Sequence, residues 1–187
     1  MPHPRLRAPG ADPLSRSCAI SSGTGEAGAA PKTPAEARSN RACGLASLRM
    51  ILLAYGRKAP TVTELLKLAV KHEVLTPRGA LHAGIASLAT DLGVAATAEP
   101  VQVEDLLARL DVAPVIVSVT EQLPNDGRSG GHLVILRGYE DGPDPTIFIR
   151  DPSAWGQTHL QVSLSRLSPS YTGRAITFAP LIHNGES

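Results

Sequence analysis

The sequence predicts an α+β fold, because segments with helical periodicity come first along the chain and strand-like segments come last. The clearest helix is expected over residues 44–55, where apolar side chains recur at helical spacing until Gly56 ends it. The unbroken apolar run 115–119 predicts a strand that is buried on both faces. Two more strand-like segments, 132–139 and 146–151, flank a turn rich in Asp, Gly and Pro and predict a β-hairpin.

The remaining elements have shorter or weaker patterns. Three more segments show helical patterns and one shows a single helical turn, whereas three short apolar stretches predict strands. The helices are expected over residues 63–71, 81–92 and 103–110, the helical turn over 164–167, and the strands over 94–98, 159–163 and 174–178.

The domain organisation follows from length and composition. The 187 residues, of which 42% are hydrophobic, are enough for a single domain with one core, expected over residues 36–180. Residues 1–35 are rich in Pro, Gly, Ser and Ala without periodicity, so they are expected to form a disordered N-terminal extension. Residues 181–187 are expected to be a C-terminal tail.

Composition also excludes several classes of function. A net charge of +1 and 3% aromatic residues argue against nucleic acid as a partner. The sequence shows neither a secretory signal nor an apolar run long enough to span a membrane, so a soluble, cytoplasmic protein is expected. Two cysteines, Cys18 and Cys43, do not make a disulfide framework, and His72 and His82 lack metal-ligand partners at suitable spacing. No metal and no cofactor are therefore expected.

The predicted hairpin brings a histidine and a carboxylate together. With its turn centred near residues 142–143, the hairpin places Asp151 almost opposite Val134 and Leu133, beside the start of the strand that carries His132. A carboxylate in that position can accept a hydrogen bond from one imidazole nitrogen and leave the other nitrogen free to take a proton.

Cys43 is the candidate nucleophile for such a pair. It is expected in the first turn of the helix over residues 44–55, where unpaired amides and the helix dipole favour the thiolate and can hydrogen-bond an oxyanion. Gly44 is expected to leave room for a substrate.

Structural roles explain each of these residues when it is taken alone. Cys43 could be a small buried residue, His132 a structural strand residue, and Asp151 a turn residue before proline. Together, the three residues favour a catalytic set. His159 is the rival base, although it has no acidic residue at a comparable offset, and Trp155 is expected either to shield the Asp–His pair from water or only to pack.

The segment CGLASLRMILLAYG, from Cys43 to Gly56, resembles the cysteine motif of the bacteriocin-processing, double-glycine leader peptidase family, in which CG, then ASL, then YG are typical. The Gly-His pair at residues 131–132 and the Asp-Pro pair at residues 151–152 are similar to that family too. The likeness covers about residues 40–178, nearly everything outside the N-terminal extension.

This resemblance implies a papain-like cysteine peptidase fold over residues 36–180. In that fold the catalytic cysteine lies at a helix N-terminus in the helical part, and a C-terminal antiparallel sheet carries the histidine and the aspartate. It implies Cys43, His132 and Asp151 as catalytic residues and cleavage of a peptide bond, often after Gly-Gly in a leader segment, through a thioester acyl-enzyme. The family's domain is often fused to a membrane exporter, whereas this sequence has no apolar run long enough to span a membrane, so a free-standing form is expected. The implied partners are a peptide or protein substrate and a separate exporter or peptide-modifying enzymes.

The sequence departs from the family at the oxyanion hole. The family commonly has a glutamine six residues before the cysteine, and this chain has Ala37 there. Glu36, Ser39 and Asn40 remain as neighbours of the hole; Asn40 is chemically the best side-chain donor, and the backbone amide of Cys43 is the other expected donor.

Two other functions use the same fold. One is a catalytically weak or inactive module that binds a peptide, which the missing glutamine favours. The other is acyl transfer to an amine, because CGLASL also resembles the cysteine motif of phytochelatin synthase, a papain-fold transpeptidase.

Overall fold

The computed structural model describes residues 34–76, 79–120, 123 and 132–180. Helices dominate the first half, with a two-stranded antiparallel sheet between the second and third: α1 (Pro34–Ala54), α2 (Val62–Lys71), β1 (Leu75–Thr76), β2 (Gly79–Ala80) and α3 (His82–Asp91). The strands of the main sheet follow: β3 (Ala96–Pro100), β4 (Val115–Val119), β5 (His132–Glu140), β6 (Thr146–Arg150), β7 (Gln161–Ser163) and β8 (Tyr171–Phe178). Shorter helices interrupt them: η2 (Val103–Asp105), α4 (Leu106–Leu110), η3 (Trp155–Gln157), α5 (Leu164–Leu167) and η4 (Ser168–Ser170).

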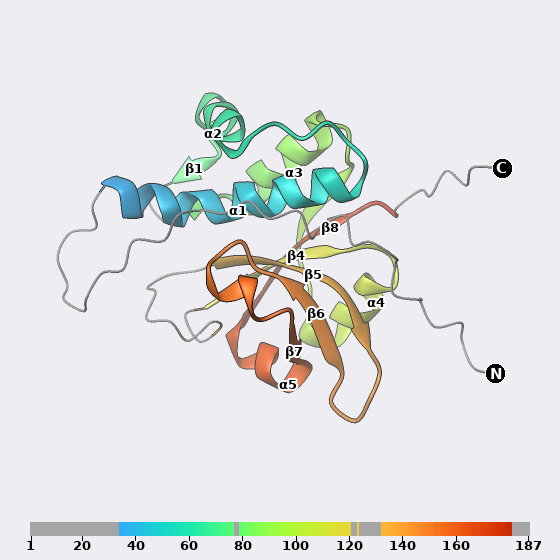
Figure 1. Ribbon diagram of the computed structural model, residues 1–187. Helices are drawn as coiled ribbons and strands as arrows, with labels where there is room; N and C mark the ends of the chain where they lie inside the picture. The colour runs from blue at the N-terminus through green and yellow to red at the C-terminus, as the bar shows by residue number, and fades with distance from the viewer. Residues whose placement is uncertain (1–33, 77–78, 121–122, 124–131, 181–187) are drawn as a thin grey trace.

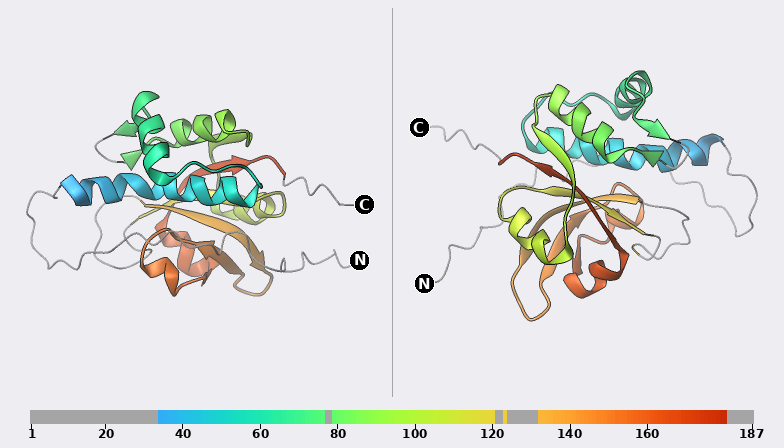
Figure 2. Two further views of the ribbon diagram at one scale, coloured as in Figure 1. Left: turned by 45° about the horizontal axis from the view of Figure 1, so that its top comes forward. Right: turned by 180° about the vertical axis from the view of Figure 1, so that it is seen from behind.

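The molecule has a helical layer on one side of an antiparallel sheet. Figure 1 shows α1, α2 and α3 together on one side, with α4 and α5 on the other. The sheet has the strand order β3-β8-β4-β5-β6-β7, and its neighbouring strands all pair antiparallel. The views in Figure 2 show α1 lying along the sheet, and α1 packs on β5. The α+β prediction is confirmed.

Each face of the sheet has its own apolar core. Helices α1 and α3 pack on one face through Leu45, Leu48 and Ile85, together with Leu133 and Ile135 of β5, and α2 packs on α1 and α3. On the other face, side chains of α4 and α5 pack against the alternate residues of the strands. Strand β4 contributes to both cores, so the prediction that residues 115–119 are buried on both faces is confirmed.

Local chemistry sets the ends of the first two helices. Gly56 adopts a φ of 64°, a conformation that favours glycine, and the amide of Arg57 reaches back to the carbonyl of Leu52. Helix α2 starts after Thr61, whose hydroxyl accepts from the amide of Glu64 while the Glu64 carboxylate accepts from the amide of Thr61.

The predicted start of the first helix, at residue 44, is wrong. Helix α1 begins ten residues earlier at Pro34, so Cys43 lies in its third turn and not in its first. Proline suits the first position of a helix, and the Ala, Glu and Arg residues that follow are strong helix formers. Apart from Pro34 and Ala35, the expected disordered extension falls outside the described residues, and so does the expected tail.

Smaller differences concern elements that depend on their neighbours. Strand β3 runs two residues later than predicted because it pairs with β8, from Ala96 opposite Phe178 to Pro100 opposite Arg174. The helix predicted over residues 103–110 is a 3-10 turn followed by a short α-helix. Within the described part of the chain, no helix has the length and apolar character needed to cross a membrane.

Candidate active site

His132 and Asp151 meet where the β5–β6 hairpin ends. The two strands pair from Glu140 opposite Thr146 to Ile135 opposite Arg150, so the next residue, Asp151, lies beside the start of β5 as the hairpin register predicted. The Nε2 atom of His132 lies 2.7 Å from the Oδ1 atom of Asp151. Both residues are buried.

Asp151 is held in place by the turn that follows it. Its Oδ1 atom also accepts a hydrogen bond of 2.7 Å from the amide of Ser153. Gly156 packs directly on the Asp151 backbone: a Cβ atom added there would overlap the Asp151 carbonyl oxygen and lie 2.6 Å from the Asp151 Cβ. The turn therefore fixes the carboxylate from two sides, and it requires glycine at position 156.

Cys43 reaches this pair from helix α1. Its thiol shares a hydrogen bond with the side chain of His132. Because Nε2 of the ring is taken by Asp151, Nδ1 is the nitrogen that faces the sulfur. The backbone groups of Leu133 and Gly44 also hydrogen-bond the sulfur. The structure thus brings all three predicted residues together.

Gly44 has a different role from the one predicted. An added Cβ would lie 2.6 Å from Cδ1 of Ile85 and 2.8 Å from Cδ1 of Leu133. Gly44 therefore allows α1 to pack closely on α3 and β5, and the space beside it is filled by the protein's own side chains.

The ionisation of the three groups is coupled. Burial, the largest effect, would raise the pKa of Cys43, but the hydrogen bond and charge of His132 and the backbone hydrogen bonds lower it overall. Burial would likewise lower the pKa of His132, but its bonds to Asp151 and Cys43 and their charges raise it to about 9. Burial would raise the pKa of Asp151, yet His132 and Ser153 hold it below its usual range. The arrangement favours a thiolate, an imidazolium and a carboxylate in a row.

The thiolate does not owe this stabilisation to a helix N-terminus. Cys43 lies nine residues after Pro34, and the effect of the helix dipole is confined to the first turn. In a regular α-helix the amide of residue 43 also pairs with the carbonyl of residue 39. The groups that stabilise the sulfur therefore come largely from β5.

The other candidates from the sequence lie elsewhere. His72 caps the C-terminus of α2 and His82 opens α3. His159 is exposed; its Nδ1 lies 3.0 Å from the Trp155 carbonyl oxygen, and its ring stacks on Trp155 with centroids 4.3 Å apart. Cys18 falls outside the described residues. Among the described residues, no group of three His, Cys, Asp or Glu side chains could hold a metal ion.

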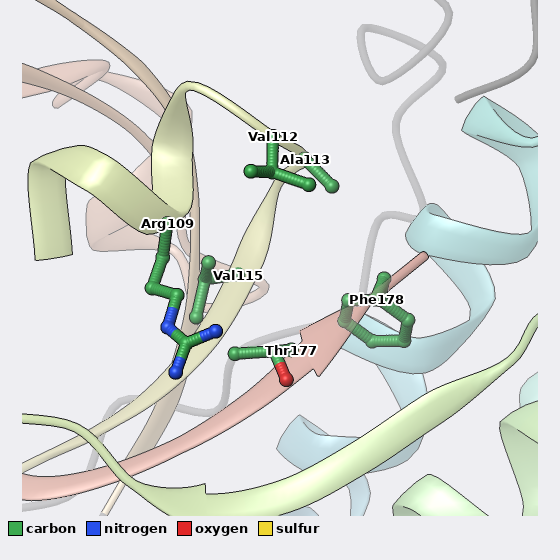
Figure 3. Close-up of a pocket in the computed structure, with 6 residues that line it drawn as sticks. All are labelled: Arg109, Val112, Ala113, Val115, Thr177 and Phe178. Carbon is green, nitrogen blue, oxygen red and sulfur yellow. The ribbon is translucent and has the colours of Figure 1, made fainter. Parts of the chain in front are cut away.

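A small hollow of about 80 Å³ lies away from this site. Figure 3 shows it between α4, the loop that follows, and strands β4 and β8. It includes Val115, which pairs with Leu136, whereas His132 pairs with Val119 at the opposite end of β4. The nearby charges are already paired, since Arg109 lies 3.5 Å from Glu99. The hollow therefore plays no part in the Cys–His–Asp arrangement.

Two residues that support the site were missed by sequence reasoning. Gly156 had no detectable signal, because its role depends on the turn after Asp151. Ser47 stands four residues after Cys43, one helical turn away, and donates a hydrogen bond of 3.2 Å to the Leu133 carbonyl. Its spacing from Cys43 could have indicated a shared helix face.

An α+β fold that joins a helix-borne cysteine to a histidine and an aspartate on the sheet defines the class of papain-like cysteine peptidases. The chain belongs to the Peptidase C39 family, whose model matches residues 33–181. It is therefore a cysteine peptidase by family, and the resemblance to the double-glycine leader peptidases is confirmed.

Solved structures agree with this assignment. The peptidase domain of Streptococcus ComA, a bifunctional ABC transporter involved in quorum sensing, is 25% identical with a TM-score of 0.59, and the match covers 75% of this chain and 92% of that one. A double-glycine motif protease from an AMS/PCAT transporter, solved with its leader peptide, is 23% identical (TM-score 0.54, 74% and 84% covered). A C39-like peptidase from Bacillus anthracis is 18% identical (TM-score 0.56, 75% and 89% covered). No curated protein sequence matches the chain.

Proposed function

We propose that this peptidase cleaves a peptide bond in a leader segment through a thioester acyl-enzyme, with Cys43 as nucleophile, His132 as general base and acid, and Asp151 as the residue that orients His132. The observation that carries the proposal is the continuous hydrogen-bonded row from the Cys43 thiol through His132 to Asp151. A row of this kind satisfies the geometric requirement for an activated nucleophile.

The reaction follows from the ionisation of the row. The Cys43 thiolate attacks the scissile carbonyl carbon, and the carbonyl π electrons move onto the oxygen. When the oxyanion collapses, the C–N bond breaks and the imidazolium of His132 gives its proton to the departing amine, which leaves a thioester on Cys43. His132 then takes a proton from water as the water attacks the thioester; the C–S bond breaks, the carboxylic acid is released, and the Cys43 thiolate is again paired with the imidazolium of His132.

For the oxyanion we propose Asn40 and the backbone amide of Cys43 as donors. Asn40 precedes Cys43 by three residues, which is about one turn of α1. Helix α1 continues through residues 39–42, so Asn40 lies within the helix and not in a loop before it. The Cys43 amide would have to leave the carbonyl of residue 39 in order to donate to a substrate.

The substrate we propose is a peptide with a double-glycine leader, and the proposed partner is a separate exporter or peptide-modifying enzyme. The protease solved with a leader peptide and the ComA peptidase domain, part of an ABC transporter, support this class of substrate and partner.

The test uses the full chain, its Cys43→Ala variant and synthetic peptides that contain an internal Gly-Gly. Cleavage after Gly-Gly is expected for the wild type, with a covalent adduct of the leader fragment detected by intact mass and no turnover for Cys43→Ala. If the acyl group on Cys43 is transferred to an added amine in preference to water, the proposed reaction would be acyl transfer and not hydrolysis.

A second candidate, a peptide-binding module without turnover, is favoured by the unbroken helix through Cys43 and by Ala37 in place of glutamine. Binding of the same peptides without cleavage or adduct would establish it. It would also refute the peptidase mechanism proposed above.

A further inference from the structure

A buried side-chain hydrogen bond joins helix α1 to strand β5 beside the proposed nucleophile. The Ser47 hydroxyl donates to the carbonyl of Leu133 across 3.2 Å, although the two residues are 86 apart in sequence. Ser47 is fully buried and follows Cys43 by four residues, so the two lie on one face of α1.

The same strand residue also contacts the sulfur. The backbone of Leu133 hydrogen-bonds Cys43, and the only backbone donor of that residue is its amide. In an extended strand, the N–H and C=O groups of one residue point to the same side. The pairing of β5 with β6 ends at Ile135, which lies opposite Arg150. The N–H and C=O groups of Leu133 therefore do not pair with β6.

From this juxtaposition we infer that Ser47 is a positioning residue: by holding the Leu133 carbonyl, it keeps the Leu133 amide aimed at the Cys43 sulfur and sets α1 in register with His132. The inference rests on the proposed function, because it assigns Ser47 a role in forming the nucleophilic thiolate.

The arrangement explains a serine at this position better than packing does. Alanine has a higher helix propensity and would fill an apolar interface without an exchange of hydrogen bonds. A serine that only satisfied a buried carbonyl would stabilise the fold by about 1 kcal/mol and would leave the ionisation of Cys43 unchanged. The pH dependence of the thiol therefore separates a positioning role from a purely structural one.

The experiment measures the rate constant for alkylation of Cys43 by iodoacetamide from pH 4 to pH 10, in the full chain with Cys18→Ser. In Ser47→Ala, we expect the rate constant at mildly acidic pH to fall by about threefold to tenfold, with a change of less than about twofold at pH 10, where the thiol is ionised in both proteins. The inflection should move to higher pH. The matched control is Ser168→Ala, which removes a hydroxyl that donates to the Leu164 carbonyl at 2.8 Å and should leave the profile unchanged.

Ser47→Cys provides a second variant of nearly the same size, because a thiol is a much weaker donor than a hydroxyl. Its profile should shift in the same direction, with alkylation at Cys43 identified by fragment mass. A wild-type profile in either folded variant would overturn the inference and leave the peptidase proposal intact. If neither variant folds while Ser168→Ala does, the role of Ser47 is structural and the inference also fails. An ordinary thiol profile in the wild type itself would overturn both proposals.

Discussion

The charge of Asp151 is expected to set the pKa of His132. The carboxylate lies 2.7 Å from Nε2 of the ring in a buried site, and the pKa of His132 is raised from 6.5 to about 9. That difference corresponds to roughly 3 kcal/mol in favour of the imidazolium, and it is the net result of burial, which opposes the charge, and of the hydrogen bonds and charges of Asp151 and Cys43. Loss of the Asp151 charge should therefore lower the pKa of His132, by an amount large enough to change its protonation equilibrium by about tenfold.

Asp151→Asn isolates the charge from the geometry. The Oδ1 position accepts from both His132 and the Ser153 amide, so two donors require an oxygen there and the amide group cannot turn its nitrogen toward the ring. The tautomer of His132 is thus kept while the charge is lost. Asp151→Ala should destabilise the protein more than Asp151→Asn does, because it leaves Nε2 of the buried His132 ring without its hydrogen-bond partner.

The measurement is an NMR titration of the His132 Cε1–H signal, assigned by its absence in His132→Ala. His132 is protonated below its pKa, so the basic limb of kcat/KM should move to lower pH together with the NMR midpoint in Asp151→Asn. Asp144→Asn is the control, since this exposed carboxylate in the turn between β5 and β6 accepts hydrogen bonds from the amide and the hydroxyl of Ser165 in α5. An unchanged His132 midpoint in Asp151→Asn would refute the assignment of Asp151 as the residue that raises the pKa of His132.

Two more substitutions test the surroundings of the site. Gly156→Ala should destabilise the protein by about 1–3 kcal/mol and lower kcat/KM, because the new Cβ would displace the Asp151 backbone. Gly142→Ala is the control and should have neither effect, since its added Cβ would meet its nearest atom at 3.9 Å. Equal effects of the two substitutions on thermal unfolding and on activity would contradict this reasoning. Asn40→Ala should lower kcat by about tenfold to a thousandfold with little change in unfolding temperature, and an unchanged kcat would exclude Asn40 as an oxyanion donor.

The sequence was sufficient to predict the structure where elements that are adjacent along the chain also contact one another. The β5–β6 hairpin is local, and a short turn with Asp, Gly and Pro fixes which residues face each other, so the proximity of Asp151 to His132 could be predicted. The alternation of Val115, Ile116 and Val117 between two cores likewise followed from an unbroken apolar run.

Sequence reasoning failed where a boundary or a contact depended on distant residues. The start of α1 was placed too late because residues 34–42 carry few large apolar side chains, although their helix propensity is high. Strands β1 and β2 have two residues each, too few for any periodicity to show. The contact of Ser47 with Leu133 spans 86 residues, and no local pattern contains it.

The site is divided between two layers, and this division determines how the thiolate is stabilised. Cys43 comes from α1, whereas His132 opens β5 and Asp151 directly follows β6. Between the layers lie fully buried side chains of α1, Leu45 and Leu48, packed against β5. Interiors of this kind are close-packed, so a change in the core would be transmitted to the position of the helix. A small shift of α1 would lengthen the hydrogen bonds from the Cys43 sulfur to His132 and to Leu133 at the same time. The apolar core between helix and sheet thus acts on the ionisation of Cys43, since it sets the distance over which the imidazolium and the strand amide stabilise the sulfur.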